Sequence, residues 1–279
     1  MSLLLRNVTP TIGTEVSGID LNKAAQIEKH AGELRSLLDQ RQVIFFRDQH
    51  VNVDCQVQLA SLFGDPEPIS SAFPPHPENS LVRVLKLSGA RTGTDVWHAD
   101  QSWQAIPPAG ACLCAINVPE SGGDTIWAST TAAFESLDPA FKEYLESLTV
   151  VHHWEYPEVV ENVMKQDPSG ARYRELRDSR KPMEHPMVMQ HPRTGKNLIF
   201  ANSLYTIRVK GLPDEQSRDL LGTVCRLVQV PERQVRFSWR PGDVAIWDNL
   251  ATQHYAVNDY HPFPRLMHRV GIRQRRTAL

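Results

Sequence analysis

The sequence contains no apolar run that approaches the roughly 20 residues of a membrane-spanning helix. Residues 1–13 carry too short an apolar stretch for a secretory signal and show no cleavage-site pattern, so we expect a cytoplasmic protein. Charge of one sign is not in excess either, because 30 Lys and Arg face 32 Asp and Glu. We therefore expect neither nucleic acid nor a membrane surface as a partner, but a small molecule or a second copy of the chain.

Cysteine is scarce, and the four cysteines form no CxxC pair. They are too few for a disulfide scaffold in a chain of 279 residues, and their spacing does not predict a zinc site. We interpret them as reduced thiols, three of them buried. The chain also lacks internal repeats, low-complexity tracts and an obvious linker, which favours a single domain over residues 1–279.

Proline and glycine are plentiful, and 20 prolines and 15 glycines divide the chain into short segments. Such punctuation is typical of many short strands. Strands are predicted at residues 14–21, 42–49, 111–119, 124–129, 234–240, 244–248, 252–257 and 265–273, with a hairpin at 185–202. Helices are predicted at 24–40, 51–63, 130–148 with a break at Pro139, and 213–230. The pattern predicts a mainly β fold with helices (α+β), a sandwich or jelly roll with helical decoration.

Residues 156–181, between the predicted helix 130–148 and the predicted hairpin 185–202, are polar and charged and contain proline and glycine. We expect it to form a surface insertion or lid rather than part of the core.

Residues 95–103 read DVWHADQSW and place His98 two positions before Asp100. In a β-strand, residues i and i+2 share a face at a separation of about 6.6 Å, so these side chains could converge on one metal ion. The alternative is a hydrogen-bonded pair at a strand end, because a bare HxD occurs often by chance.

The C-terminal region contains a further possible metal ligand, His254, and two arginines that could bind anions. His254 follows a strand-like run, and Arg265, Met267 and Arg269 alternate so that both arginines share one face. Two buried arginines side by side are costly unless anions meet them. Two histidines and one carboxylate on one face of an octahedron leave the opposite face open, which is an arrangement that suits ferrous iron.

Several stretches together resemble the TauD/TfdA (taurine dioxygenase) family of Fe(II)- and 2-oxoglutarate-dependent dioxygenases, and the resemblance extends over most of the chain. They are IGTEVSGIDL, QVIFFRDQ, WHAD, PPAGACLCAINVPESGGDTIWAS, HPMVMQHPRTGK, GDVAIWDNLATQHYAVNDY and RLMHRV. The HxD motif, the distal histidine and the following arginine stand in the family's order and at its spacing.

The resemblance implies a double-stranded β-helix with His98, Asp100 and His254 as the iron ligands. Thr125 and Arg265 would bind the far carboxylate of 2-oxoglutarate. The implied reaction uses Fe(II), 2-oxoglutarate and O2, hydroxylates a small anionic organic substrate and releases succinate and CO2.

For the primary substrate, the resemblance implies that Arg269 binds an anionic group. The family's histidine and tyrosine after FG are missing from residues 65–75, where Phe73 stands near the tyrosine position, and Thr94 stands near a family asparagine. Taurine itself is therefore not the expected substrate.

Aromatic residues at Trp154, Tyr156 and Tyr205 fall in segments that line the family's pocket, and Tyr205 is the one we expect to contact the substrate. They would suit an alkyl sulfate, an arylsulfonate or an aryloxyalkanoate.

Two other functions are compatible with the residues alone. One is a cupin-type zinc enzyme that catalyses hydrolysis or isomerisation without oxygen, which would leave Thr125 and Arg265 without a role. The other is a ligand-binding module that has lost activity. Because soluble assemblies are commonly dimers, we also expect a homo-oligomer.

Overall fold

The computed structural model describes residues 2–67, 73–87 and 94–275. Its largest element is a sheet with the strand order β1-β2-β3-β14-β6-β16-β4, in which β5 also pairs with β16. The strands are β1 (Leu4–Asn7), β2 (Thr14–Ser17), β3 (Val43–Phe46), β4 (Asp65–Glu67), β5 (Arg83–Leu87), β6 (Gly110–Asn117), β14 (Val244–Asp248) and β16 (Arg265–Arg273). Neighbouring strands are antiparallel except for β2 and β3.

A second sheet, of order β13-β7-β15, packs against the first. It contains β13 (Gln234–Phe237), β7 (Thr125–Ser129) and β15 (Thr252–Ala256). The rings of Phe45 and Phe237 stack between the two sheets at 4.2 Å, and Trp127 meets Phe45 edge-on at 5.6 Å. Two sheets with an apolar core between them form the predicted jelly roll.

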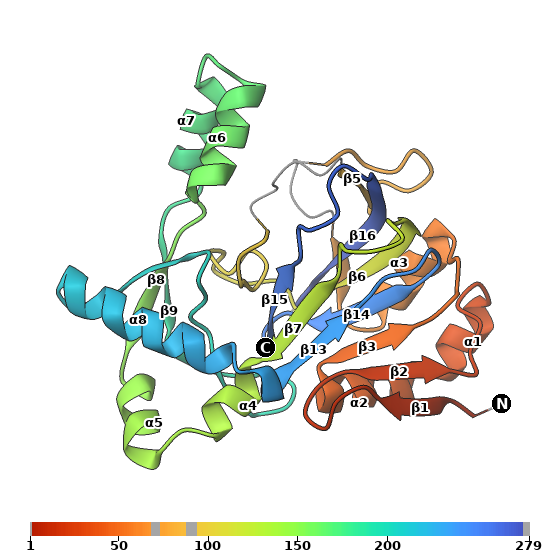
Figure 1. The fold of residues 1–279 in the computed structure, drawn as a ribbon, viewed down its shortest axis with the longest axis horizontal. Helices are drawn as coiled ribbons and strands as arrows, with labels where there is room; N and C mark the ends of the chain where they lie inside the picture. The colour runs from red at the N-terminus through yellow and green to blue at the C-terminus, as the bar shows by residue number, and fades with distance from the viewer. Residues whose placement is uncertain (1, 68–72, 88–93, 276–279) are drawn as a thin grey trace.

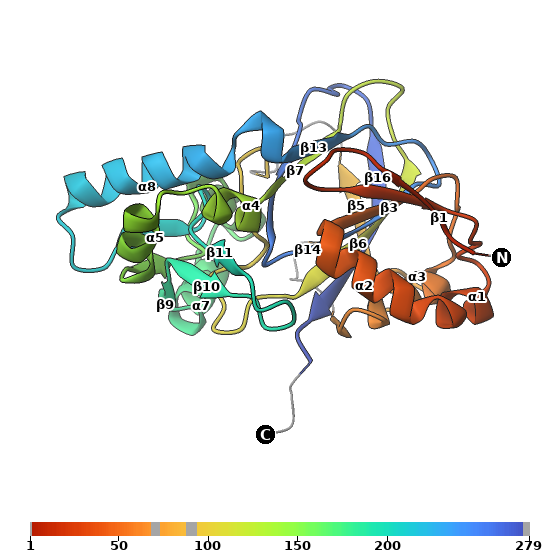
Figure 2. The same cartoon turned by 90° about the horizontal axis from the view of Figure 1, so that it is seen from below.

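The other face of the large sheet is covered by α1 (Ala24–Lys29), α2 (Ala31–Arg41) and α3 (Val53–Ser61), as Figure 2 shows. In β3, Phe45 faces the inter-sheet core while Ile44 and Phe46 face these helices. Burial on both faces explains why this strand is a continuous apolar run rather than an alternating one. The single helix predicted for residues 24–40 is two helices, because the backbone at His30 leaves the helical conformation.

A smaller lobe packs beside the jelly roll (Figure 2). Its sheet has the order β12-β8-β9, and a separate hairpin joins β10 to β11 as predicted. The strands are β8 (Thr149–His152), β9 (Met183–Pro186), β10 (Val188–Gln190), β11 (Asn197–Ile199) and β12 (Thr206–Val209). The helices are α4 (Thr130–Glu135), α5 (Pro139–Glu146), α8 (Asp214–Val228) and the 3-10 turn η1 (Pro231–Arg233). The predicted break at Pro139 is confirmed, since this residue begins α5 after the cap Asp138.

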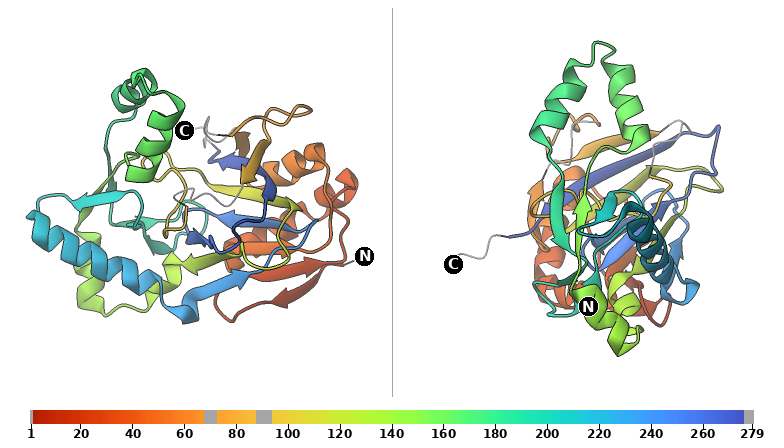
Figure 3. Two further views of the ribbon diagram at one scale, coloured as in Figure 1. Left: turned by 45° about the horizontal axis from the view of Figure 1, so that its top comes forward. Right: turned by 90° about the vertical axis from the view of Figure 1, so that its left-hand side faces the viewer.

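The segment 156–181 forms a helical hairpin of α6 (Pro157–Gln166) and α7 (Ala171–Ser179). It projects from the body of the molecule (Figures 1 and 3). None of the helices within the described ranges is long and apolar enough to cross a membrane. All four cysteines are free and buried, one more than we expected.

Candidate functional site

The segment that carries the HxD motif meets β15 through its backbone. His98 and His254 form an isolated antiparallel bridge, in which each amide donates to the other residue's carbonyl oxygen at 3.0 and 2.7 Å. The expected strand through His98 and Asp100 does not form, because the chain turns at Asp100 and Gln101 adopts a positive φ of 47°. The turn, rather than strand periodicity, directs the carboxylate back towards the histidines.

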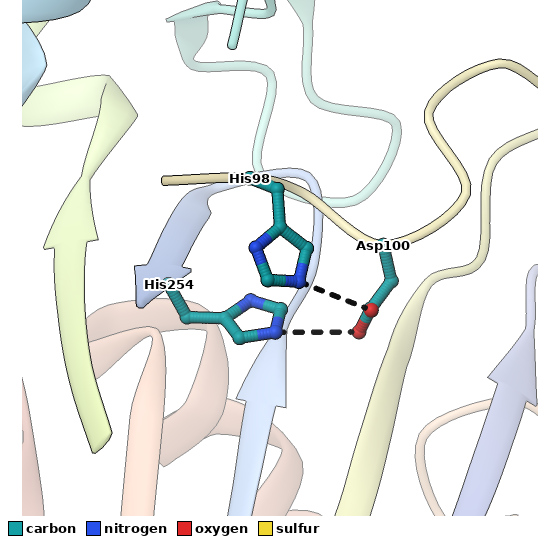
Figure 4. Close-up of side chains that lie close together, drawn as sticks. All are labelled: His98, Asp100 and His254. Carbon is teal, nitrogen blue, oxygen red and sulfur yellow. Dashed lines mark ion pairs between the residues drawn. The ribbon is translucent and has the colours of Figure 1, made fainter. Parts of the chain in front are cut away.

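The three side chains converge (Figure 4). The Nε2 atoms of His98 and His254 each lie 3.7 Å from a different oxygen of the Asp100 carboxylate. One donor atom from each residue lies within 4.8 Å of the others, and all three residues are buried. In the part of the chain that the structure describes, this is the sole group of three or more His, Cys, Asp or Glu residues that could hold a metal ion.

Neighbouring groups orient these donors. The Nδ1 atom of His98 lies 2.7 Å from the Val96 carbonyl oxygen, which makes it the protonated nitrogen and leaves Nε2 free to bind a metal. The buried Asn249 fixes the turn at Asp100, because its side-chain oxygen accepts from the Asp100 amide at 2.7 Å. The amide nitrogen of Asn249 donates to the carbonyl oxygens of Asp100 and Pro108. Asn249 directly follows the predicted strand 244–248, but no local pattern in the sequence marks it as a site residue.

The electrostatics of the cluster suit a divalent cation. Burial lowers the pKa of His98 and brings that of His254 well below its usual value, so both imidazoles are neutral at neutral pH. Burial raises the pKa of Asp100, but the positive charge of Arg269 outweighs burial and holds this pKa at about 2. Neutral imidazoles and an ionised carboxylate are the protonation states that metal binding requires.

Beside this cluster lies a cavity, here called the inner chamber, which His98, His254, Thr125 and Arg265 help to line. The Arg265 side chain is buried, and its Nε and Nη2 atoms have no hydrogen-bond partner among the described residues. Unpartnered buried guanidinium nitrogens are costly, so this position calls for an anion.

Thr125 completes the inner chamber from the start of β7. Its Oγ1 accepts from the indole nitrogen of Trp239 at 3.0 Å, so its own proton is available for an acceptor in the chamber. The Arg265 guanidinium lies 5.9 Å from the Trp239 ring, so one indole contacts both residues. A free hydroxyl and a free guanidinium fit a carboxylate such as that of 2-oxoglutarate. The sequence analysis did not select Trp239, which lies just beyond β13.

Arg265 and Arg269 both line the inner chamber, which confirms that they share a face of β16. The Nη2 atom of Arg269 donates to the Asp100 carboxylate, and its guanidinium lies 5.4 Å from the Trp247 ring. His268 lies on the opposite face, where its ring packs against His76 at 4.8 Å.

A second cavity, the outer chamber, shares His98 and Arg269 with the inner one and is also lined by Asp100. Tyr205 lines it as expected, with its ring 6.3 Å from that of His98. Further lining residues are Trp154, Phe73 and Thr94, whereas Tyr156 lines neither chamber. Of the segment 65–75 that departs from the family pattern, residues 68–72 lie outside the described residues.

Comparison with known proteins identifies the same family, TauD/TfdA, that the sequence motifs resemble. The sequence model described as "Taurine catabolism dioxygenase TauD, TfdA family" matches residues 5–270. An alkylsulfatase of Acinetobacter baylyi is 33% identical, over 97% of this chain and 84% of that protein. An alpha-ketoglutarate-dependent sulfate ester dioxygenase of Pseudomonas putida is 35% identical, over 98% of this chain and 90% of that protein.

Among solved structures, a taurine dioxygenase from Burkholderia xenovorans superposes with a TM-score of 0.82 at 26% identity, covering 98% of this chain and 90% of that one. The match of fold agrees with the match of sequence over nearly the whole chain. The chain therefore belongs to the TauD/TfdA family and is an oxidoreductase, a dioxygenase that depends on Fe(II), 2-oxoglutarate and O2.

Proposed function

We propose that His98, Asp100 and His254 bind the iron, and that Thr125 and Arg265 bind the far carboxylate of 2-oxoglutarate. The observation that carries this assignment is the buried Arg265 guanidinium, unpartnered within the described residues and in one chamber with the two histidines. A zinc-dependent hydrolase or isomerase would give that guanidinium no anion to bind.

The two chambers would bind different molecules, 2-oxoglutarate and the primary substrate. Fe(II) bound at these residues, together with 2-oxoglutarate and O2, would supply the oxidising chemistry: one oxygen atom of O2 enters the substrate as a hydroxyl group and the other enters succinate, which forms with CO2 from 2-oxoglutarate. The chain itself holds the 2-oxoglutarate carboxylate in the inner chamber and the primary substrate in the outer one. Trp154 and Tyr205 provide apolar surface that limits water around the reacting carbon.

The proposed primary substrate is a small organic anion of the sulfate ester or sulfonate type, with an aryloxyalkanoate as the related possibility. Its anionic group binds Arg269, and Tyr205 contacts its carbon skeleton. Support comes from the position of Arg269 between the chambers and from the two relatives whose names specify sulfate esters. When the carbon that bears a sulfate ester gains a hydroxyl group, the product releases sulfate and leaves a carbonyl compound.

We further propose that residues 1–279 are one catalytic domain and that the hairpin of residues 156–181 acts as its lid. The outer chamber is lined by Val159 at the base of α6 and by Arg180 directly after α7, which supports this role. The homo-oligomeric state, the cytoplasmic location and the absence of nucleic-acid and membrane partners stay predictions.

The test is succinate release with a panel of alkyl sulfates, sulfonates and aryloxy acids. Turnover is expected with at least one anionic class and not with the matching uncharged alcohols. In the absence of O2, the wild-type protein with Fe(II) and 2-oxoglutarate should show a visible charge-transfer band that Asp100→Ala lacks. A colourless wild-type mixture would contradict the assigned iron ligands.

A further inference from the structure

The outer chamber has more positive charge than one anionic group requires. Three arginines from three separate segments line it: Arg83 from β5, Arg180 from the end of the hairpin, and Arg269 from β16. Asp100 is the sole carboxylate among its described lining residues, and it is assigned to the metal. An excess of buried or half-buried guanidinium groups favours a ligand with more than one negative charge.

Arg83 and Arg269 form one cationic group. They are direct cross-strand partners in the β5–β16 register, so their side chains lie next to each other on one face. The Nε atom of Arg83 is buried and has no hydrogen-bond partner within the described part of the chain. Like charges placed opposite each other are unfavourable, so an anion between the two guanidinium groups would stabilise the pair.

Arg180 forms a second cationic position on another wall. Its guanidinium lies 4.9 Å from the ring of Trp103 and 5.6 Å from that of Trp154. The hairpin that ends at Arg180 and the β5–β16 pair rise from different sides of the molecule (Figure 1). The contact with aromatic faces holds the guanidinium plane while its N–H edge stays available for an acceptor.

Two other arginines of the hairpin are paired with carboxylates. Arg172 bonds to Glu175, and Arg177 lies 3.3 Å from Asp178. The Arg180 guanidinium, by contrast, contacts the two indole rings and lies within electrostatic reach of Glu175, and no hydrogen bond or ion pair joins it to a described side chain. Burial raises the pKa of Tyr205, while the charges of Arg269 and Arg180 oppose that rise, so Tyr205 lies within electrostatic reach of both cations.

We infer that Arg180 is a specificity-determining residue, which binds a second anionic group at the end of the primary substrate remote from the group held by Arg83 and Arg269. This inference rests on the function proposed above and names its substrate class: an alkyl sulfate whose chain ends in a carboxylate. A planar carboxylate matches the N–H edge of a guanidinium in a bidentate fashion, which makes it the favoured second group.

The experiment compares alkyl sulfates, from butyl to octyl, with the ω-carboxyalkyl sulfates of the same chain lengths. Binding to the anaerobic complex with Fe(II) and 2-oxoglutarate is measured by equilibrium dialysis, and turnover by succinate release. At the best chain length, the carboxylated sulfate should bind about tenfold or more tightly than its plain counterpart.

Arg180→Gln should abolish this preference, because it should weaken the binding of the carboxylated sulfates at least tenfold more than that of the plain alkyl sulfates. Arg180→Lys keeps the charge but not the planar fork, so it should retain part of the preference. Arg177→Gln is the matched control, because it removes the same charge from an exposed position of α7, the helix that directly precedes Arg180, and should retain the full preference. Circular dichroism checks that each variant is folded.

Turnover of both series without a preference for the carboxylated compounds would overturn the inference alone. So would an equal loss of affinity for both series in Arg180→Gln. Failure of the wild-type enzyme to turn over any member of either series would instead contradict the sulfate ester function, and the inference with it.

Discussion

Arg269 donates a hydrogen bond to the carboxylate of Asp100, so a residue assigned to the substrate contacts a residue assigned to the metal. Arg265, four positions earlier on the same strand face, has no such partner within the described residues. The two arginines therefore differ in their hydrogen-bond partners, and we expect their substitution to affect the binding of different molecules.

Arg265→Ala is expected to raise the KM for 2-oxoglutarate far more than that for the primary substrate, and Arg269→Ala to show the reverse. Loss of a buried charge-assisted contact costs about 2–5 kcal/mol. Steady-state kinetics with each substrate varied in turn provide the measurement. Equal effects of one substitution on both KM values would refute the assignment of the two arginines.

Trp239→Phe is expected to raise the KM for 2-oxoglutarate by several-fold, with a smaller effect on the primary substrate. The indole donates to Thr125 and lies beside Arg265, so its removal releases both contacts to the carboxylate. A hydrogen bond of this kind contributes about 1 kcal/mol. Thr125→Val serves as the comparison, and an unchanged KM in both variants would argue against the inner chamber as the 2-oxoglutarate site.

Asn249→Ala is expected to weaken divalent metal binding by about 10–100-fold, although Asn249 is not itself a ligand. Its side chain holds both the amide and the carbonyl of Asp100, and its loss frees the turn that aims the carboxylate. Calorimetric titration with Fe(II) under anaerobic conditions measures the effect. Asn249→Asp keeps the acceptor for the Asp100 amide and loses the donor, so its affinity should fall between those of wild type and Asn249→Ala.

The buried His152 is expected to make the free energy of unfolding smaller in mild acid. Burial, with a smaller contribution from His185, lowers the pKa of His152 to about 3. The unfolded chain takes up this proton near pH 6.5 and the folded chain does not, so the free energy of unfolding should fall as pH falls from about 6.5 to about 3. At about pH 5 this group accounts for about 2 kcal/mol.

Urea unfolding near neutral pH and near pH 5 tests this dependence. His152→Gln should lose much of it, whereas His50→Gln should retain it, since His50 is exposed. A wild-type midpoint that does not move with pH in this range would show that His152 is protonated in the folded state.

The sequence was sufficient to predict which three side chains converge and which two arginines share a face, because the first follow from a motif and the second from strand alternation. It did not reveal Asn249 or Trp239. Their roles arise from contacts with Asp100 and Thr125, more than a hundred positions away in the chain, and no local pattern records such a contact.

The helices of the hairpin were missed for a different reason. In α7, Leu176 is the one buried residue, so the apolar periodicity that signals a helix is weak. The strand expected through His98 and Asp100 was wrong because alternation alone does not distinguish an extended segment from a turn. A positive φ is usually marked in a sequence by a glycine, but here the residue with a positive φ is Gln101, so the sequence gives no sign of the turn.

The backbone bridge between His98 and His254 has a wider consequence. Two main-chain hydrogen bonds hold the backbones of the two histidines together, and main-chain groups form these bonds without the help of any side chain. The residues proposed to contact the substrate, Tyr205, Trp154 and Arg180, belong to other segments of the chain. Mutations can therefore remodel the specificity of this enzyme while its iron chemistry is retained, which makes the scaffold well suited to laboratory evolution towards new oxyanion esters.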